Sequence, residues 1–419
     1  MKVCLVGSTH PCHNPRLIRE ADTLAAMGHD IKVVAPSFMP GLHEKDRRLI
    51  ATREWRLVSA DFRPGTWRRR YRSLLVRGRK RFARELFGRL RWGRAVEYAF
   101  TAALPELKRL ALRERADWFI AHAHPALPVA AAAARHWQAR LGFDCEDLLA
   151  ELGADPPEIV RRIERRYLPA CNYVSVPSQA MAKRLQENYA IPAPIVLYNV
   201  FLLALADGLA APIERPARGI LRLHWFGQTV GPGRGLEEAI EAMKLLGPGV
   251  ELHLRGVISG EYRATLADLA RQPGGPANIF FHPQIDHDDL IRSLAEFDVG
   301  LALERLDNGS YSRTVTNKVF SYLLAGLAVA ATDTPGQREV MGQVPSAGFL
   351  YPAGEPGALA AGLRRWQSDI QEMHASQQAA WDAARQRFCW DIEKENYLQA
   401  LDHRTCHSSA DRLTNREAN

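Results

Sequence analysis

Short apolar segments alternate with amphipathic segments along most of the chain. Residues 2–7 are apolar and end at Gly7, residues 16–27 repeat apolar side chains at helical spacing, and residues 31–36 are apolar again. A short apolar run is typical of a buried strand, whereas a period of 3.6 residues is typical of an amphipathic helix. The first 36 residues therefore predict strand, helix and strand, the repeating unit of a parallel sheet covered by helices.

The same alternation continues to about residue 400 with one interruption. Further strands are predicted at residues 117–124, 173–178, 221–227, 250–256, 278–283, 298–303 and 327–332, and further helices at 179–189, at 236–246 and from about 317. A segment with several Pro and Gly residues, 207–219, interrupts the pattern. We therefore expect two doubly wound α/β domains, residues 1–200 and 219–384, and a disordered polar tail at 403–419. Such sheets bind ligands at the carboxyl ends of their strands, so two that face each other leave a ligand cleft.

The composition narrows the class of protein. Of the 419 residues, 47% are hydrophobic and 24% are charged, which is ordinary for a globular protein. The longest apolar run, residues 126–134, is too short to span a bilayer, and the N-terminus lacks the apolar stretch of a signal peptide. The six cysteines form no CxxC pair, which disfavours zinc and thioredoxin motifs and suits a reducing compartment. We expect a cytoplasmic protein, soluble or peripheral to a membrane.

The positive charge is concentrated near the N-terminus. The net charge is +8, yet residues 63–94 alone hold 13 Lys and Arg against one acid, Glu85. This segment interleaves arginine with apolar side chains that can share one helical face, namely Leu74, Leu75, Phe82, Leu86 and Leu90. A basic amphipathic helix suits an anionic membrane surface, and a solvated helix packed on the domain is the alternative. Nucleic acid is not expected as a partner, because no nucleic-acid motif accompanies the charges.

A glycine-rich loop follows the strand predicted at 221–227. Gly227, Gly231, Gly233 and Gly235 allow the backbone to approach a ligand closely, and Arg234 precedes the next helix. Arginine forks onto phosphate oxygens, and a helix N-terminus adds oriented amides. The spacing is neither GxGxxG nor GxxxxGK[ST], so a dinucleotide fingerprint and a P-loop are both disfavoured. Phosphate binding and a plain turn both remain open.

A second candidate anion site lies at residues 312–336. Thr316 is expected to cap a helix that begins near Asn317, which places Lys318 in its first turn. A cation at this end opposes the helix dipole. The placement is reasonable if Lys318 and the free amides face a bound anion, and a solvated lysine is the alternative.

These segments, in this order, resemble the retaining glycosyltransferases of the GT-B fold, family 4 type (glycosyl transferases group 1). The resemblance covers about residues 2–400. It rests on residues 13–34, 117–125, 143–151, 172–189, 226–235, 317–333 and 388–401. It implies two Rossmann-like domains that face each other across a cleft, with a final helix at 385–402 that crosses back to the N-terminal domain.

The resemblance also implies an activity. A nucleotide-diphosphate sugar would bind the C-terminal domain, and a carbohydrate or lipid-linked acceptor of surface polysaccharide or glycolipid synthesis would bind the N-terminal domain. When the sugar leaves, negative charge grows on the diphosphate and must be met by cations and amides. Arg234 and Lys318 are implied to supply these charges without a metal or a cofactor, and His124 is implied to lie beside the reacting sugar.

The predicted donor site departs from the family pattern. Gly227, Thr316 and Asn317 are expected to contact the nucleotide sugar. Gln228 stands where many relatives have arginine, and Arg313 and Ser321 stand where the family has two glutamates. We hypothesise that Arg313 replaces the missing cation and that Ser321 makes one hydrogen bond to the ribose.

The N-terminal domain offers further candidates. Arg16 could reach an acceptor carboxylate or phosphate, or be solvated. Asp144 and Glu146 could orient an acceptor hydroxyl, although we favour a role in holding the interdomain loop. His122 is expected on the same strand face as His124, but a metal pair is disfavoured because no Cys or carboxylate ligand stands nearby in the sequence.

Two other functions remain open. A sugar-nucleotide epimerase of the same fold would need acid and base carboxylates in the cleft, and none is assigned; the role of Glu339 near the cleft is open. A non-catalytic nucleotide-sugar-binding or scaffold protein is suggested by Gln228 and Ser321.

Overall fold

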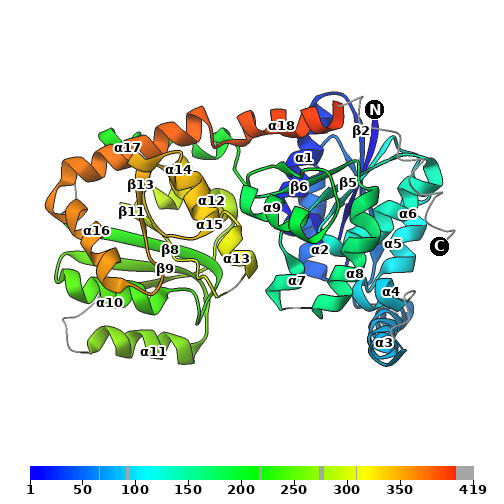
Figure 1. The fold of residues 1–419 in the computed structure, drawn as a ribbon, viewed down its shortest axis with the longest axis horizontal. Coiled ribbons are helices and arrows are strands. Elements are labelled where there is room, and N and C mark those ends of the chain that lie inside the picture. Colours follow the sequence, from blue (N-terminus) through cyan, green and yellow to red (C-terminus); the bar gives the residue numbers. More distant parts are fainter. Residues whose placement is uncertain are drawn as a thin grey trace. The chain divides into compact units, whose positions relative to one another are not determined.

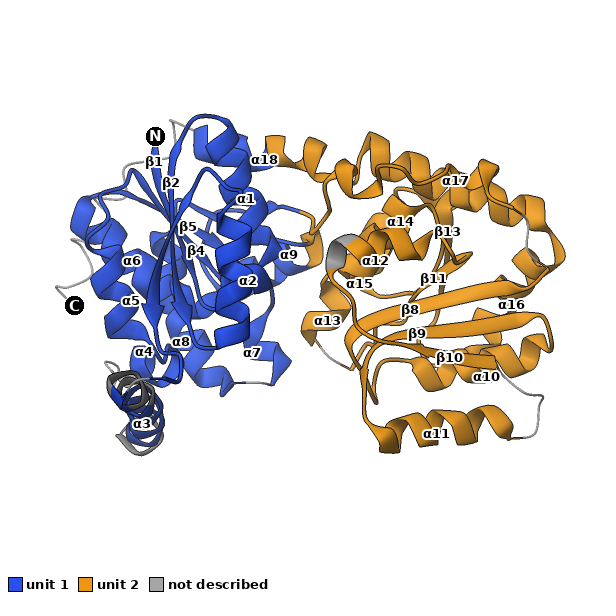
Figure 2. Cartoon of the chain, turned by 180° about the vertical axis from the view of Figure 1, so that it is seen from behind, with its two compact units in different colours: residues 1–177, 181–197, 396–419 blue, residues 178–180, 198–395 orange. Residues whose placement is uncertain are grey.

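The protein is described here from a computed structural model, which divides into two compact units (Figures 1 and 2). The structure describes residues 1–65, 67–90, 95–153, 155–216, 219–272, 278–307 and 309–402. Unit 1 comprises residues 1–177, 181–197 and 396–419, and unit 2 comprises residues 178–180 and 198–395. The tail predicted at 403–419 lies outside the described residues. In the described part of the chain, no helix has both the length and the hydropathy that crossing a bilayer requires.

Unit 1 is built on a seven-stranded parallel sheet with the order β3-β2-β1-β4-β5-β6-β7. Its strands are β1 Lys2–Gly7, β2 Asp30–Ser37, β3 Arg56–Asp61, β4 Trp118–His122, β5 Arg140–Asp144, β6 Tyr173–Val176 and β7 Ile195–Val196. The strand order reverses between β1 and β4, which is the point where doubly wound sheets bind ligands.

Helices cover both faces of this sheet. They are α1 Pro15–Ala26, α2 Pro40–Ile50, α3 Trp67–Leu90, α4 Ala95–Phe100, α5 Leu104–Ala111, α6 Leu127–Trp137, α7 Leu149–Leu152, α8 Pro157–Tyr167 and α9 Gln179–Asn188. Cys4 and Val6 of β1 share a core with α5, α6 and α8, while the alternate residues Val3 and Leu5 point to the opposite face, where α1 packs on β1 and β2. The apolar stripe of α1 and the continuous apolar strands thus meet as the sequence predicts.

Unit 2 is built on a six-stranded parallel sheet with the order β10-β9-β8-β11-β12-β13. Its strands are β8 Leu221–Val230, β9 Val250–Ile258, β10 Asn278–His282, β11 Val299–Ala302, β12 Ala328–Thr332 and β13 Gly348–Tyr351. This order is that of a dinucleotide-binding Rossmann sheet, and it reverses between β8 and β11.

The helices of unit 2 also form two layers (Figure 1). They are α10 Leu236–Leu246, α11 Gly260–Arg271, α12 His287–Leu294, α13 Gly309–Arg313, α14 Asn317–Ala325, α15 Pro335–Met341, α16 Pro356–Ser368 and α17 Ile370–Gln386. The helices α10, α11 and α16 share one core with the sheet. Figure 1 shows α12, α14 and α17 on the other side of the strands. Two Rossmann-like α/β sheets are therefore present, as predicted.

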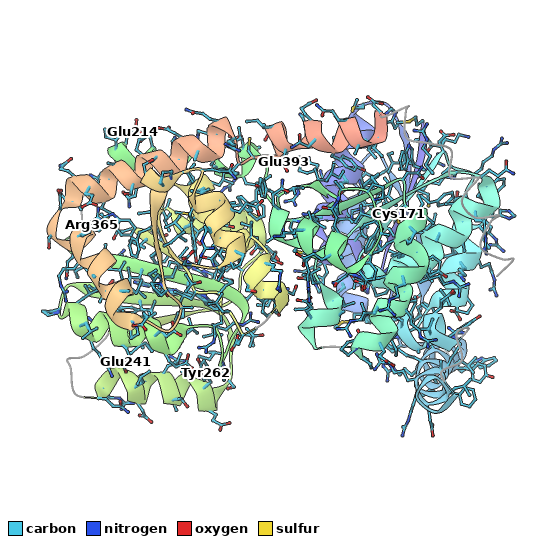
Figure 3. All side chains as sticks on the ribbon, in the orientation of Figure 1. Cys171, Glu214, Glu241, Tyr262, Arg365 and Glu393 are labelled. Atoms are coloured by element: carbon cyan, nitrogen blue, oxygen red, sulfur yellow. The ribbon has the colours of Figure 1, made fainter. Side chains whose placement is uncertain are left out.

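The final helix, α18 Trp390–Asp402, begins in unit 2 and ends in unit 1. In unit 2, the carboxylate of Glu393 accepts a hydrogen bond from the backbone N–H of Tyr198 at 2.8 Å (Figure 3). In unit 1, the fully buried side chain of Tyr397 lies against Tyr173 and Glu20. Each half of α18 is thus part of a different unit.

One glycine fixes the position of α14, which carries a predicted site residue. A Cβ at Gly300 on β11 would lie 2.1 Å from the ring of Tyr322, and the Tyr322 hydroxyl donates to the carbonyls of His224 and Leu301 at 3.1 Å. Only glycine allows this approach, so α14 packs closely on β11, and it also contacts β12.

The basic helix α3 is confirmed as a helix, but its apolar residues divide between two faces. Val76 and Ala83 are buried against unit 1, whereas Leu74, Leu75 and Phe82 are exposed. Leu86 is half-buried and packs on the core, so it does not belong with the exposed residues as the sequence suggested. The side chain of Leu90 lies outside the described residues. Figure 2 shows α3 beside α4 at the margin of unit 1.

Candidate active site

A pocket of about 370 Å³ opens where the strand order of unit 2 reverses, between the carboxyl ends of β8 and β11. We name it the β8–β11 pocket. Its lining residues are Trp225, Gly233, Arg234, Leu303, Glu304, Arg305, Asp307, Tyr311 and Lys318. Two of the three predicted catalytic residues, Arg234 and Lys318, therefore lie in one pocket at the place where such sheets bind ligands.

Arg234 is presented by the glycine-rich loop. Gly233 and Gly235 adopt φ angles of 72° and 73°, the left-handed region that favours glycine, and a Cβ at Gly235 would lie 2.8 Å from the Cβ of Leu303. The loop can therefore pass close to the end of β11. Among the described residues Arg234 makes no ion pair, and its guanidinium carbon lies 5.4 Å from the ring centre of Tyr311. A cation at the pocket wall is thus available to an anionic ligand.

Lys318 lies in the first turn of α14, as predicted. Thr316 caps the helix by accepting a hydrogen bond from the Lys318 backbone N–H. The Lys318 ammonium is 2.7 Å from the Glu304 carboxylate and 5.4 Å from the ring centre of Trp225. The side chain is buried, so the alternative of a solvated lysine is wrong.

Glu304 is a pocket residue that the sequence did not indicate. It follows β11, its carboxylate contacts Lys318 and the Gln337 amide, and its carbonyl accepts from the Thr332 hydroxyl at 2.6 Å. The only feature of the sequence that could have indicated Glu304 as a site residue is its position directly after the strand predicted at 298–303. The carboxylate holds the ammonium of Lys318 at the pocket wall.

Unit 1 contains a buried polar network at the start of α1. The Arg16 guanidinium donates to both carboxylate oxygens of Asp144, at 2.7 and 2.5 Å, and to the carbonyl of Leu197 at 3.1 Å. Asn14, the N-cap of α1, donates to Glu146 at 2.6 Å. Arg16 is therefore not a solvated arginine, and Asp144 and Glu146 are tied to α1 rather than to an interdomain loop.

His122, at the end of β4, joins this network. Its ring nitrogens lie 3.2 Å from the Glu20 carboxylate and 3.4 Å from that of Asp144. Burial alone would lower the pKa of His122, but the two carboxylates raise it to about 10. Burial likewise opposes ionisation of Asp144, yet the charges of Arg16 and His122 hold its pKa well below the usual range. His122 is therefore a cation and Asp144 an anion, whereas burial and the charge of Asp144 raise the pKa of Glu146 to about 7.

Glu20, His122 and Asp144 are the one set of side chains among the described residues that could hold a metal ion. Their ligand atoms lie within 4.8 Å of one another. The expectation that no carboxylate lies near His122 is therefore wrong, because α1 brings Glu20 and β5 brings Asp144 to it. Both oxygens of Asp144 already accept hydrogen bonds from Arg16, and Ser175 donates to one of them at 2.8 Å. The Arg16 charge and these bonds favour a proton on His122 over a metal ion.

His124 has different partners from His122. Ala123 adopts a φ of 64°, which ends the alternation of the strand, so the prediction that the two histidines share one face is wrong. The Nε2 of His124 lies 2.8 Å from the Glu164 carboxylate, whose other oxygen accepts from the Tyr189 hydroxyl. His124 is thus held by α8 at the carboxyl edge of the sheet.

Comparison with known families decides the identity of these two units. A model described as Glycosyltransferase Family 4 matches residues 16–200, and one described as Glycosyl transferases group 1 matches residues 228–382. Together they cover most of the chain in the order expected. The chain belongs to the group 1 glycosyltransferases of the GT-B fold. No curated protein has a significantly similar sequence.

Solved structures share the fold at low sequence identity. HepE from Anabaena in complex with UDP is 17% identical, with a TM-score of 0.68. The alignment covers 96% of this chain and 99% of the HepE chain. Sucrose-phosphate synthase from Thermosynechococcus elongatus is 14% identical, with a TM-score of 0.69 and coverage of 96% and 98%. A TarM variant from S. aureus in complex with fondaparinux, α-GlcNAc-glycerol and UDP is 9% identical, with a TM-score of 0.67 and coverage of 96% and 100%.

Several predicted donor contacts of this glycosyltransferase do not line the β8–β11 pocket. Gly227 and Gln228 lie in the irregular part of β8, and Gln228 is exposed. The Arg313 guanidinium donates to the Gly309 carbonyl at 2.8 Å within α13. The Ser321 hydroxyl is buried and donates to the Asn317 carbonyl at 3.0 Å, so it is turned into its own helix. In this arrangement Ser321 does not present a hydroxyl to a ribose.

The raised pKa of His122 predicts how the stability of this glycosyltransferase depends on pH. A basic group whose pKa is higher in the folded state stabilises the fold fully below its unfolded pKa of about 6.5, and this contribution is lost as the pH rises towards 10. Between pH 7 and 8 the free energy of unfolding should therefore fall by up to about 1.4 kcal/mol per pH unit. Urea denaturation of the wild type and of His122→Asn measures this slope, which should be shallower in the variant. Equal slopes would contradict the charged state assigned to His122.

Proposed function

We propose that this glycosyltransferase transfers a hexose from a nucleotide-diphosphate sugar to a carbohydrate or lipid-linked acceptor, with retention of configuration, in the synthesis of a cell-surface polysaccharide or glycolipid. The observation that carries the donor assignment is the β8–β11 pocket. Arg234 and Lys318 meet there from two elements at the switch point of a Rossmann sheet. An arginine, a lysine and a helix N-terminus at one wall suit a diphosphate.

The residues of the pocket account for the charge that develops during transfer. As the bond between the sugar and the diphosphate breaks, negative charge grows on the leaving phosphate. Arg234 can fork onto its oxygens, and Lys318 together with the free amides at Asn317 and Thr316 can face the same charge. No metal or other cofactor is part of this proposal. His124 is proposed to lie beside the reacting sugar, held in one ring orientation by Glu164.

A thermal-shift assay tests which nucleotide-diphosphate sugar the protein binds. We expect a nucleotide-diphosphate sugar to raise the melting temperature, because a ligand that binds only the folded state stabilises it by about 2.7 kcal/mol at a hundred times its Kd. A panel of UDP-, GDP-, ADP- and dTDP-sugars is compared, with UDP-sugars first because HepE and the TarM variant were solved with UDP. Arg234→Ala should reduce the shift. If no donor stabilises the protein, the donor site is wrongly assigned, and a stabilising donor without turnover would favour a scaffold protein.

We also propose that α3 holds the enzyme peripherally at the inner face of the plasma membrane. Exposed apolar side chains recur along one face of α3, opposite the buried Val76 and Ala83; they are Trp67, Tyr71, Leu74, Leu75 and Phe82. An exposed apolar stripe on a basic helix suits insertion into an anionic bilayer surface, where each Lys or Arg adds about 1 kcal/mol.

Flotation with vesicles of phosphatidylcholine and phosphatidylglycerol tests this surface. The wild type should co-float at low salt, and Leu74→Gln with Phe82→Gln should reduce the bound fraction severalfold, because these side chains are 67% and 66% exposed. Leu245→Gln, at a 54% exposed leucine of unit 2, is the matched control and should bind like the wild type. Absence of wild-type flotation, or equal flotation of all three proteins, would refute membrane docking by α3.

A further inference from the structure

A second polar pocket lies wholly within unit 1, between α8, α9 and the segment that follows β5. It has a volume of about 260 Å³, which is small for a ligand site and suits one sugar residue or a small ion. Three arginines line it, Arg161 and Arg165 from α8 and Arg184 from α9. We name it the arginine pocket.

Two of these arginines form no ion pair. Arg161 and Arg165 are one helical turn apart on α8, so they share one face. In the part of the chain that the structure describes, neither forms an ion pair. By contrast, Arg166 on the same helix lies 3.4 Å from Glu97. The unpaired guanidiniums are therefore the two that line the pocket.

The acids of the pocket are already engaged. Glu151 accepts from the Arg184 guanidinium at 2.7 Å. The buried carboxylate of Glu164 accepts from His124 and from Tyr189. Burial would raise its pKa, but these two partners and the charge of Arg161 lower it. Both carboxylates thus have donors of their own, and the three arginines that line the pocket outnumber its two acids.

We propose that the arginine pocket binds an oxyanion, namely the carboxylate or phosphate of an acidic sugar residue in the acceptor. Two guanidiniums provide paired donors for such a group, and Asn188 at the wall offers an amide for a sugar hydroxyl. That the acidic sugar belongs to the acceptor rests on the proposed function, whereas the oxyanion site itself does not. Because Glu164 both lines the pocket and bonds His124, an acidic acceptor residue would lie next to the group that orients His124.

Isothermal titration calorimetry at low salt tests the pocket. Glucuronic acid and glucose 6-phosphate are the two probes, with glucose as the neutral control and inorganic phosphate as the ion alone. We expect one or both acidic sugars to bind the full-length wild type at least tenfold more tightly than glucose and inorganic phosphate do. The tighter of the two identifies the oxyanion as carboxylate or phosphate. Binding should weaken as salt is raised.

The double variant Arg161→Gln and Arg165→Gln should bind the acidic sugar at least tenfold more weakly. Both side chains are exposed, so the variant should fold. Arg115→Gln, at an exposed arginine outside the pocket, is the matched control and should bind normally. No binding of either acidic sugar, equal affinity in the double variant, or inorganic phosphate binding as tightly as the sugars would overturn the proposal.

The nucleotide experiment separates this proposal from the proposed function. The β8–β11 pocket lies in unit 2, so the double variant should keep its thermal shift with the donor sugar. If acidic sugars bind but no donor stabilises the protein, the arginine pocket stands as a site and the transferase assignment fails. If a donor binds and no acidic sugar does, the reverse holds.

Discussion

Replacing Lys318 by alanine is expected to lower kcat/KM for sugar transfer by about 10²–10³-fold, the usual effect of removing one preorganised donor from a developing negative charge. Lys318 is buried, and its ammonium lies in the β8–β11 pocket, 2.7 Å from Glu304 and above the Trp225 ring. The position is fixed by α14, which Gly300 allows to pack closely on β11. The charge is therefore in place before the leaving diphosphate forms, and the loss should appear in kcat as well as in KM.

Three comparisons make this result specific. Lys318→Arg keeps the charge and should retain more activity than the alanine variant. Arg292→Ala removes an exposed cation of unit 2 outside the pocket and should leave the rate unchanged. Melting temperatures are recorded in parallel, because Lys318→Ala leaves Glu304 without its ion pair. A folded Lys318→Ala variant with wild-type kcat/KM would show that the pocket is not where the diphosphate leaves.

Replacing Arg16 by methionine is expected to lower the free energy of unfolding by about 3–5 kcal/mol, the usual cost of breaking a buried ion pair. Arg16 and Asp144 are both buried and make two hydrogen bonds, so the variant would leave Asp144 with one fewer cation in the core. The Leu197 carbonyl would lose its donor as well. Urea denaturation followed by circular dichroism measures the change.

A surface pair of the same residue types is the control. Arg53 and Asp22 lie 3.4 Å apart with partly exposed side chains, and Arg53→Met should cost no more than about 1 kcal/mol. If Arg16→Met lowers the free energy of unfolding no more than Arg53→Met does, the buried polar network does not stabilise unit 1 as described above. If a folded Arg16→Met variant also loses acceptor affinity with unchanged donor affinity, Arg16 would have the acceptor role that the sequence allowed.

The sequence predicted most strands because their apolar residues are contiguous. The strands β1 and β2 lie within one residue of their predicted bounds, and helix α10 coincides with its prediction. Four strands were not predicted, namely β3, β5, β7 and β13, and β7 has only two residues, both half-buried. The strand β3 at the edge of its sheet has mostly half-buried side chains, and the short edge strand β13 is mostly half-buried too. In β5, Gly142 interrupts the apolar run because the Tyr173 ring lies where a Cβ would be.

The candidate site was predicted only where the signal is local. Lys318 stood out because a cation in the first turn of a helix is unfavourable without an anion, and Arg234 stood out because it lies in a glycine-rich loop. Glu304 could not be found in this way, because it follows a strand and meets Lys318 only once α14 packs on β11. The cluster of Glu20, His122 and Asp144 comes from three elements, so no spacing pattern in the sequence indicates it.

The shared helix α18 limits how the protein can be cut into working fragments. A fragment that stops after residue 197 contains the whole sheet of unit 1 but lacks residues 396–402, and with them Tyr397. That side chain is fully buried against Glu20 and Tyr173, so its loss would open the polar network to water. A recombinant unit 1 therefore needs Leu197 joined by a linker to Asn396, and a recombinant unit 2 needs residues 198–395 with the first half of α18.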